Sequence, residues 1–166
     1  GEAMLQADGI RLLAKALHDR GISVIIDTAG CVPYSEFEKV NPYIDCYYYD
    51  WKSCNEKDYA NVIGGNYSLI WNNLRQLIED GKKVRVRVPL IPGFNTSGPY
   101  SERMCTCLKQ AGVTSVDLLP FHRLGAGKYH ALGLTYAYQQ TPPLSIHIAE
   151  HISCIYRKYF DTTIEK

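Results

Sequence analysis

The sequence predicts an α/β fold in which parallel strands alternate with helices. Four apolar runs each end in polar or conformationally special residues, and helical patterns lie between them. Such alternation is typical of βαβ units, whose parallel strands place all their carboxyl ends at one edge. The composition agrees, because 166 residues with 46% hydrophobic and 21% charged side chains suit one globular domain with a sizeable core. We therefore expect a single domain over residues 1–166.

The expected elements follow from the hydrophobic spacing, taken in chain order. A first helix, with its apolar stripe at Ile10, Leu13, Ala14 and Leu17, runs up to Gly21. Later helices are expected over residues 31–40, 55–62, 67–80, 101–111 and 145–160. Strands are expected over residues 23–30, 45–52, 84–93 and 115–122, with a short terminal strand over 162–164.

The aromatic strand over residues 45–52 is the most informative of these elements. Side chains alternate along a strand, so Asp50 and Lys52 share one face with Tyr48. The opposite face, which packs against helices, then carries Tyr47, Tyr49 and Trp51. Two opposite charges on one face are compatible with a solvated strand end or a simple ion pair, and this alternative stays open for the motif alone.

Polar side chains at the other strand ends favour a shared site. The carboxyl edge of a parallel sheet is where α/β folds bind ligands and react. The residues that converge on that edge are Asp27, Asp50, Lys52, Arg87 and His122.

The third strand also predicts special backbone geometry. Its two prolines lack ladder donors, so residues 89–93 are expected to fray into an irregular segment. Unpaired backbone groups there can read a ligand such as a purine edge, and a plain strand-to-loop exit is the alternative. Downstream, the polar, glycine-rich stretch 123–133 is expected to be a functional loop at the ligand face.

Charge and cysteine content exclude several classes of protein. The formal net charge is +1 without a dense basic run, so neither nucleic acid nor a membrane surface is expected as partner. No long apolar span or signal peptide is present, and six scattered cysteines without a C-x-x-C motif favour a reducing, cytoplasmic location. Cys105 and Cys107 face apart on a helix, which argues against a metal site there.

Five short motifs occur along the chain with consistent spacing: Gly1-Glu2, Asp27-Thr28-x-Gly30, Asp50-x-Lys52, Val88-Pro89-Leu90-Ile91-Pro92-Gly93-Phe94-Asn95 and Leu119-Pro120-Phe121-His122-x-Leu124-Gly125. Together they resemble the glycyl-radical-enzyme activating enzymes, the family that includes the activator of pyruvate formate-lyase. These are radical S-adenosylmethionine (SAM) proteins with an incomplete (β/α)6 barrel. The resemblance covers essentially the whole chain.

The resemblance implies a cation site and an amino-group site. Glu2 is similar to the acid of a Gly-Gly-Glu motif that holds the amino group of SAM. Asp27, Thr28, Asp50 and the backbone oxygen of Tyr48 are similar to a monovalent-cation site beside the SAM carboxylate. A bound cation would turn the repulsion between these carboxylates and the SAM carboxylate into attraction.

The resemblance also implies the rest of the cofactor pocket and the reaction. Reductive cleavage of SAM by a [4Fe-4S] cluster gives a 5′-deoxyadenosyl radical that abstracts hydrogen from a glycine of the partner, pyruvate formate-lyase or a relative. The implied electron donor is a flavodoxin or ferredoxin. The implied pocket-lining residues are Lys52, Arg87 and His122, and those against the adenine are Ile91, Pro92 and Gly93.

One departure from the family pattern limits these implications. The C-x-x-x-C-x-x-C motif that binds the cluster is absent, as are the first two strands of the barrel. We therefore expect a C-terminal portion of such an enzyme that is inactive alone and self-associates through its exposed edge strand. Ala3 replaces the usual proline, a smaller departure.

Two other functions stay open on the sequence. The first is a cluster-free (β/α) domain whose polar rim holds a cation and a small anionic metabolite. The second is an aldolase-like barrel with Lys52 as Schiff-base nucleophile, which Asp50 on the same face disfavours because it stabilises the charged lysine.

Overall fold

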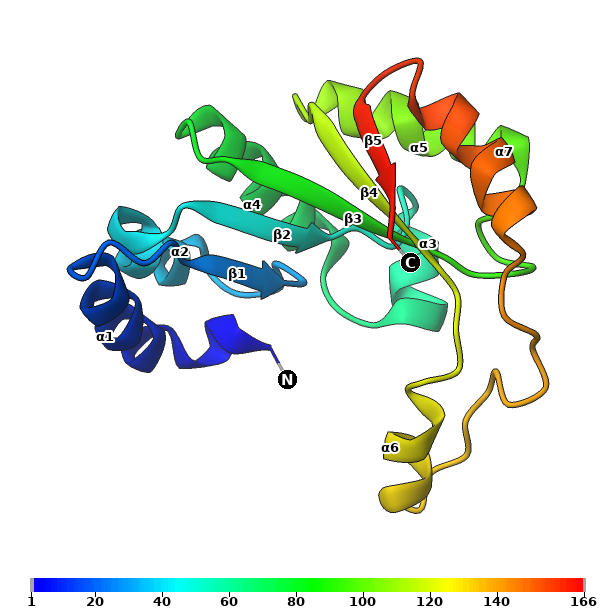
Figure 1. Cartoon of the computed structure of the whole chain (residues 1–166), viewed down its shortest axis with the longest axis horizontal. Helices are drawn as coiled ribbons and strands as arrows, with labels where there is room; N and C mark the ends of the chain where they lie inside the picture. The colour runs from blue at the N-terminus through cyan, green and yellow to red at the C-terminus, as the bar shows by residue number, and fades with distance from the viewer. Residues whose placement is uncertain (1, 166) are drawn as a thin grey trace.

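The computed structural model describes residues 2–165 as one five-stranded sheet with helices between the strands (Figure 1). The strands are β1 (Ile25–Thr28), β2 (Cys46–Asp50), β3 (Val84–Leu90), β4 (Ser115–Pro120) and β5 (Asp161–Ile164). The helices are η1 (Ala3–Gln6), α1 (Ala7–His18), α2 (Tyr34–Val40), η2 (Asn41–Tyr43), α3 (Glu56–Asp58), η3 (Tyr59–Ile63), α4 (Tyr67–Glu79), α5 (Gly98–Gln110), α6 (Ala126–Ala131) and α7 (Ile146–Tyr156).

The sheet order is β1-β2-β3-β4-β5, and every neighbouring pair is parallel. The predicted α/β class is therefore confirmed, including the short terminal strand, which pairs with β4. The sheet is open, so within residues 2–165 β1 and β5 form its edges. This arrangement is the partial barrel that the sequence predicts.

The apolar core lies on the helix-covered face of the sheet. Tyr47, Tyr49 and Trp51 are almost fully buried, as the alternation along β2 predicts. Trp51 packs among three further aromatic rings from η3 and α4, with ring centroids 5.6 to 6.3 Å away. Val86, Val116 and similar residues extend this layer across β3 and β4. Their burial fixes the register, because a slip by one residue would turn the polar face inward.

The predicted stripe of the first helix is wrong in part. Leu13 is 58% exposed, whereas Ala7 and Ala14 are buried. The apolar residues of α1 are spread widely around the helix, so the sequence is compatible with more than one buried face. The face with the small side chains Ala7 and Ala14 is buried because it lets the helix pack closely against its neighbours.

The predicted fraying of β3 also begins later than expected. Pro89 stays in the ladder opposite Leu119, and the strand continues to Leu90, whose carbonyl accepts a hydrogen bond from the Phe121 N–H at 3.1 Å. The irregular segment therefore starts at Ile91. Pro89 is tolerated because its missing N–H removes only one ladder donor.

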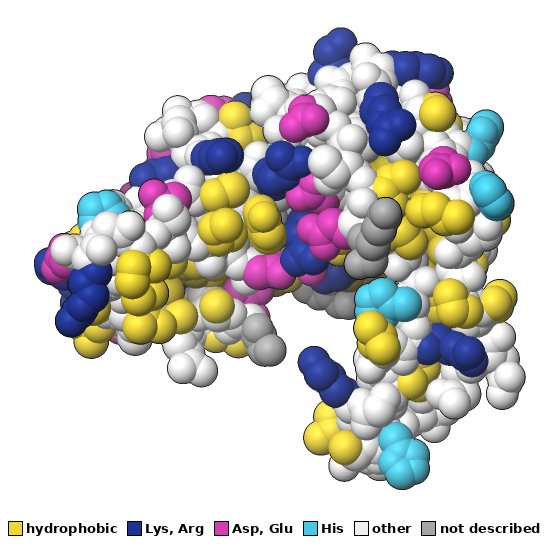
Figure 2. Space-filling model, viewed as in Figure 1, with side chains coloured by type: hydrophobic (Ala, Val, Ile, Leu, Met, Phe, Trp, Pro, Cys, Tyr) yellow, Lys and Arg dark blue, Asp and Glu magenta, His cyan; other side chains and the backbone are white. Residues whose placement is uncertain are grey.

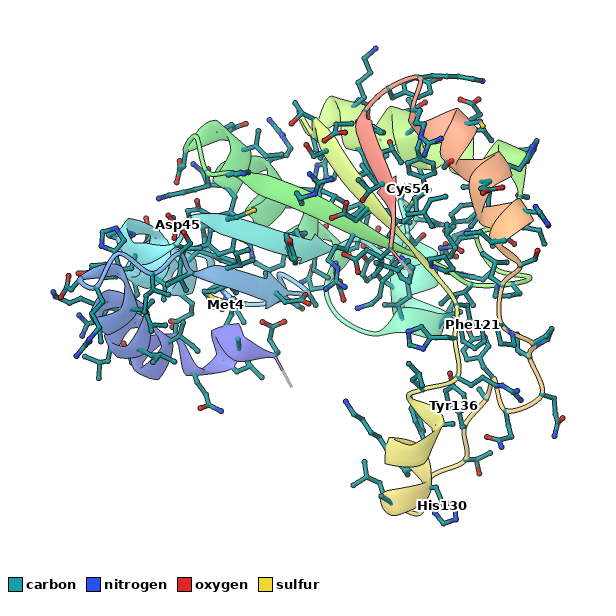
Figure 3. All side chains as sticks on the ribbon, viewed as in Figure 1. Met4, Asp45, Cys54, Phe121, His130 and Tyr136 are labelled. Carbon is teal, nitrogen blue, oxygen red and sulfur yellow. The ribbon has the colours of Figure 1, made fainter. Side chains whose placement is uncertain are left out.

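Residues 121–145 form an arm that carries α6 away from the sheet (Figure 1). The backbone N–H of Leu144 donates to the carbonyl of Phe121 at 3.0 Å, which joins the two ends of the arm at its base. Figure 3 shows Phe121 at this base and Tyr136 farther out along the arm. The segment 123–133 is outside the core, as predicted, but it contains a short helix and is not wholly a loop. Among the described residues, no helix has the length and apolar character needed to cross a membrane.

Candidate functional site

Polar side chains occupy the face of the sheet opposite the helices. The strand register sets two polar rows on that face: Asp27, Tyr48 and Arg85 in one, and Asp50, Arg87, Asp117 and Thr163 in the other. Figure 2 shows charged side chains of both signs gathered over the strand ends, beside a hollow between the N-terminal segment and the arm. Because all five strands are parallel, Asp27 and Asp50 lie at the carboxyl edge of the sheet, where α/β folds bind ligands.

Arg87 is the centre of the second row. Its guanidinium forms an ion pair with Asp27 and a second one with Glu165, at 3.2 Å from Nη2 to Oε2. The same group lies over the Tyr48 ring, 5.5 Å from the ring centroid. Its Nε is buried and has no hydrogen-bond partner among the described residues. A buried donor without a partner is rare in folded proteins, so this Nε points to a ligand or ordered water at the site.

Asp50 and Lys52 form the predicted pair, with 3.5 Å between Lys52 Nζ and Asp50 Oδ2. Burial raises the pKa of the Asp50 carboxyl, and the charge of Asp27 adds to this, while Lys52 and Arg87 oppose it. Two carboxylates that repel each other in a partly buried site are stabilised by added positive charge. The ion pair also argues against Lys52 as a neutral Schiff-base nucleophile.

Four residues are expected to hold a monovalent cation, but their side chains do not all lie on the same face of the sheet. Asp27, Tyr48 and Asp50 share the polar face. The Thr28 side chain is on the opposite, helix-covered face and is 2% exposed. Thr28 can therefore reach a cation between the two aspartates only through its backbone.

Glu2 closes the end of β1 with its carboxylate. Its Oε1 accepts from the Thr28 hydroxyl at 2.8 Å and from the Met4 N–H at 3.0 Å, and its Oε2 accepts from the Ala29 N–H at 2.8 Å. The Oε2 atom thus keeps one accepting direction for a ligand amino group. Gly1, the other half of this motif, lies outside the described residues.

Two cavities flank the base of the arm. The first, about 460 Å³, is lined by Arg87, His122, Phe121 and Glu165. The second, about 400 Å³, is lined by Ile91, His122 and aromatic side chains of the arm. The structure therefore brings Arg87, His122 and Ile91 to one region. Pro92 and Gly93 line neither cavity.

The backbone of residues 89–91 is not free to read a ligand as expected. The Ile91 N–H donates to Asn95 Oδ1 at 2.7 Å, and Asn95 Nδ2 donates to the Pro89 carbonyl at 2.7 Å. Asn95 is buried and fixes the bend after β3. It shapes this side of the pocket instead of leaving open donors and acceptors.

Three residues at the site were missed by the reasoning from sequence. Asp117, only 4% exposed, receives two hydrogen bonds from Arg85 and one from Thr163. The sequence feature that could have indicated Asp117 is an acidic residue inside an otherwise apolar strand. Asn95 had a weaker signal, an amide just after a Pro-Gly turn. Glu165 had none, because nothing in the local pattern near the chain end indicates which residue it meets.

The cysteines do not fit a [4Fe-4S] cluster. Within residues 2–165, no group of three or more Cys, His, Asp or Glu side chains is arranged to hold a metal ion. All six cysteines are free thiols, spread over several elements. A cluster needs three thiolates at one point to leave one iron open for SAM. The described residues therefore supply no cluster ligands.

Comparison with known proteins gives consistent relatives. The chain is 31% identical over 163 residues to the choline trimethylamine-lyase activating enzyme of Oleidesulfovibrio alaskensis, covering 96% of this chain and 53% of the relative. It is 32% identical over 150 residues to the pyruvate formate-lyase 2-activating enzyme of Escherichia coli, covering 90% of this chain and 51% of that one. The chain thus spans about half the length of these relatives. No family model matches the sequence.

Solved structures share the fold. A domain of a pyruvate-formate lyase-activating enzyme from Bacteroides vulgatus has a TM-score of 0.79 at 20% identity, covering 100% of this chain and 95% of that domain. SuiB of Streptococcus suis, solved with S-adenosylmethionine bound, has a TM-score of 0.66 at 12% identity, covering 94% of this chain and 34% of SuiB. Over about half of their length, this chain is thus similar to activating enzymes of glycyl radical enzymes, and it shares its fold with a solved domain of one such enzyme.

Proposed function

We propose that this chain is the SAM-orienting portion of an enzyme that activates a glycyl radical enzyme. The observation that carries the proposal is the polar face of the sheet, on which Arg87 pairs with Asp27 and Asp50 pairs with Lys52. Arg87 also lines a cavity of about 460 Å³. When bound, SAM supplies the 5′-deoxyadenosyl group that takes hydrogen from a glycine of the partner. The residues of this chain bind and orient it.

The charges of the site match the two ends of SAM. A monovalent cation would be held by the carboxylates of Asp27 and Asp50 and by the backbone oxygens of Tyr48 and Thr28, and it would supply positive charge for the SAM carboxylate. Glu2 receives the amino group through the free accepting direction of its Oε2. Each charged group of the ligand then meets an opposite charge.

The nucleoside end of SAM would be held by residues at the base of the arm. His122 and Ile91 line the cavity there, beside aromatic rings, and Pro92 and Gly93 complete the turn that follows. The Nε–H of Arg87 is a buried donor on the same side that a ligand can accept from. Lys52 neutralises the charge of Asp50 through their ion pair. Apolar walls with a few fixed polar groups are typical of such ligand pockets.

The remaining parts of the reaction come from outside this chain. The [4Fe-4S] cluster is held by cysteines elsewhere in the full protein, since the described residues do not fit it. The partner is a glycyl radical enzyme, pyruvate formate-lyase or a relative. The electron donor is a flavodoxin or ferredoxin, and the location is cytoplasmic.

The experiment compares the full protein with this chain alone. Both are reconstituted with iron and sulfide under reducing, oxygen-free conditions and supplied with SAM. We expect the full protein to show a cluster by EPR and to form 5′-deoxyadenosine, and this chain alone to do neither. Cluster formation and SAM cleavage by the isolated chain would contradict the division of roles. Failure of the full protein to cleave SAM, with tight binding of a cation and an anionic metabolite, would favour a cluster-free binding domain.

A further inference from the structure

Two cysteines that are far apart in sequence meet on the helix-covered side of the molecule. Cys54 follows β2 (labelled in Figure 3), and Cys107 is on α5. Both are half-buried and line one open pocket of about 430 Å³. The two thiols lie close enough for each to shift the pKa of the other, and the Tyr67 hydroxyl lies 3.9 Å from Cys107 Sγ. None of the residues assigned to SAM lines this pocket.

The two thiols differ in acidity. The hydrogen bond from Cys107 lowers the pKa of the Cys54 thiol to about 7 against the opposing effect of burial, and the charge of Arg103 adds to the lowering. The same hydrogen bond, together with burial, raises the pKa of Cys107. Cys54 is therefore the thiol that ionises first near neutral pH, while Cys107 stays protonated longer, which is the division between an attacking and a resolving cysteine.

The other four cysteines lack this arrangement. Cys105 is fully buried, and burial raises the pKa of its thiol to about 12. Cys46 is buried in β2, where burial likewise raises its pKa. Cys31 and Cys154 do not line the pocket. Among the cysteines of the described residues, only Cys54 and Cys107 line one open pocket together and shift each other's pKa in opposite directions.

We propose that Cys54 and Cys107 form a reactive thiol–disulfide pair that takes low-molecular-weight disulfides as its oxidant. The Cys54 thiolate attacks one sulfur of the disulfide and forms a mixed disulfide, which releases one small thiolate. Cys107 loses its proton and attacks Cys54 Sγ, which releases the second small thiolate. The two cysteines lose two electrons and two protons in total, and the small disulfide becomes two thiols.

The pair is a modification site next to the strand end but independent of the proposed function. Its disulfide would link the segment after β2 to α5, across a pocket that small molecules can enter. Ser53, directly before Cys54, is already tied to this region by hydrogen bonds with Asp58 and with the Tyr100 hydroxyl. The segment after β2 is therefore already held against α5 at the residue next to Cys54.

The test treats the reduced protein with oxidised glutathione and follows thiols by mass spectrometry. After alkylation in denaturant, we expect a mass loss of two hydrogens, two blocked thiols, and a peptide in which Cys54 is joined to Cys107. Cys107→Ser should accumulate glutathione on Cys54, because no resolving thiol remains. Cys54→Ser should be modified at least tenfold more slowly at position 107.

Cys154→Ser is the matched control, since it removes an exposed thiol outside the pocket and should leave the Cys54–Cys107 disulfide unchanged. Circular dichroism of each variant shows whether it folds. Full alkylation of both thiols after treatment, or glutathione spread equally over Cys31, Cys54 and Cys154, would overturn the proposal. Both outcomes are independent of SAM binding, so they leave the proposed function untouched.

Discussion

Gly30 explains why a glycine ends the motif that starts at Asp27. Its φ is +72°, a left-handed conformation, and an added Cβ would overlap the hydroxyl end of Tyr49. That hydroxyl donates to the carbonyl of Ile70 at 2.7 Å, while the Gly30 carbonyl accepts from Asn73 at 2.8 Å. Gly30 therefore joins the end of β1 to β2 and α4, which holds the polar strand ends in place.

Gly30→Ala is expected to destabilise the protein by about 3 kcal/mol or more, because backbone strain adds to overlap with a buried ring. Gly21→Ala is the matched control. It has the same φ of +72° but open space around the Cβ, so only strain remains, about 1 kcal/mol. Urea unfolding of both variants measures the difference, and equal losses would contradict the role of Tyr49.

Asp117 gives a prediction for acid stability. Burial alone would raise the pKa of this carboxyl, but hydrogen bonds from Arg85 and Thr163 lower it below its usual range. An unfolded aspartate has a pKa of about 3.9, so the unfolded state binds the proton more readily. The stabilisation is thus present above about pH 4 and lost as the pH falls through the lower folded pKa.

Asp117→Asn should cost about 3 kcal/mol near neutral pH, because Arg85 loses its buried partner, and the cost should shrink below about pH 4. Asp161→Asn is the control, since Asp161 is 70% exposed and lies 3.5 Å from the same arginine. It should cost at most about 1 kcal/mol. Urea unfolding from pH 3 to 7 measures the free energy of unfolding of both variants. A loss of stability in Asp117→Asn that does not change with pH would contradict this prediction.

For single residues, the sequence predicts which face of the sheet a side chain occupies, because side chains alternate along a strand. Asp50, Lys52 and Arg87 were placed on the polar face because their neighbours are apolar at every second position, and the structure agrees. The Glu165–Arg87 pair could not be predicted, because it depends on where β5 joins the sheet. The Thr28 side chain follows the same alternation as Asp27 and so points away from it.

At the element scale, strands and long helices were predictable, and segment ends were less so. α4 begins at the Asn66 cap and ends before Gly81, where the residue types indicate. The exposed stretch that contains α6 has no apolar stripe, so periodicity could not reveal that helix. The extension of β3 to Leu90 depends on pairing with β4, which is a tertiary effect.

Asn95 provides the test at this scale, because one amide holds the bend after β3. Asn95→Ala leaves the Ile91 N–H and the Pro89 carbonyl without partners, at a cost of about 1 to 3 kcal/mol. Asn95→Asp keeps the acceptor for the Ile91 N–H but turns a buried carboxylate oxygen toward the Pro89 carbonyl, so it should also be destabilising. Amide hydrogen exchange at Ile91 should speed up in Asn95→Ala, and unchanged exchange there would show that the bend has other support.

At the scale of the whole molecule, the parallel open sheet was predictable from the alternation of strands and helices, whereas the arm was not. Apolar side chains are exposed at and just before the edge strand β1: Ile25 in the strand is 50% exposed, and Ile22, which precedes it, is 48% exposed. Within the described residues β1 pairs only with β2. An exposed strand edge of this kind templates pairing with another chain.

The chain is therefore expected to self-associate at high concentration, by pairing at β1 or by burial of the apolar part of its open face. Sedimentation velocity should show species larger than a monomer, and Ile25→Lys should shift them toward the monomer. Leu134→Lys, on the exposed arm, is the control and should change nothing. A clean monomer for the wild-type chain throughout the concentration range would refute this expectation.

We propose above all that Asp27 and Asp50 hold a cation that binds the SAM carboxylate. The most direct measurement is calorimetric titration of SAM into the full protein that contains this chain, with and without potassium, for wild type and Asp50→Asn. Asp19→Asn, an exposed partner of Lys15 on the side of α1, is the matched control. We expect potassium to tighten SAM binding in wild type and in the control. Asp50→Asn should weaken SAM binding by about 2 kcal/mol or more, which is at least tenfold in affinity. Potassium should no longer tighten SAM binding in this variant. Equal SAM affinities and equal potassium responses in wild type and Asp50→Asn would instead mean that Asp50 only pairs with Lys52 at a solvated rim, and would contradict the account.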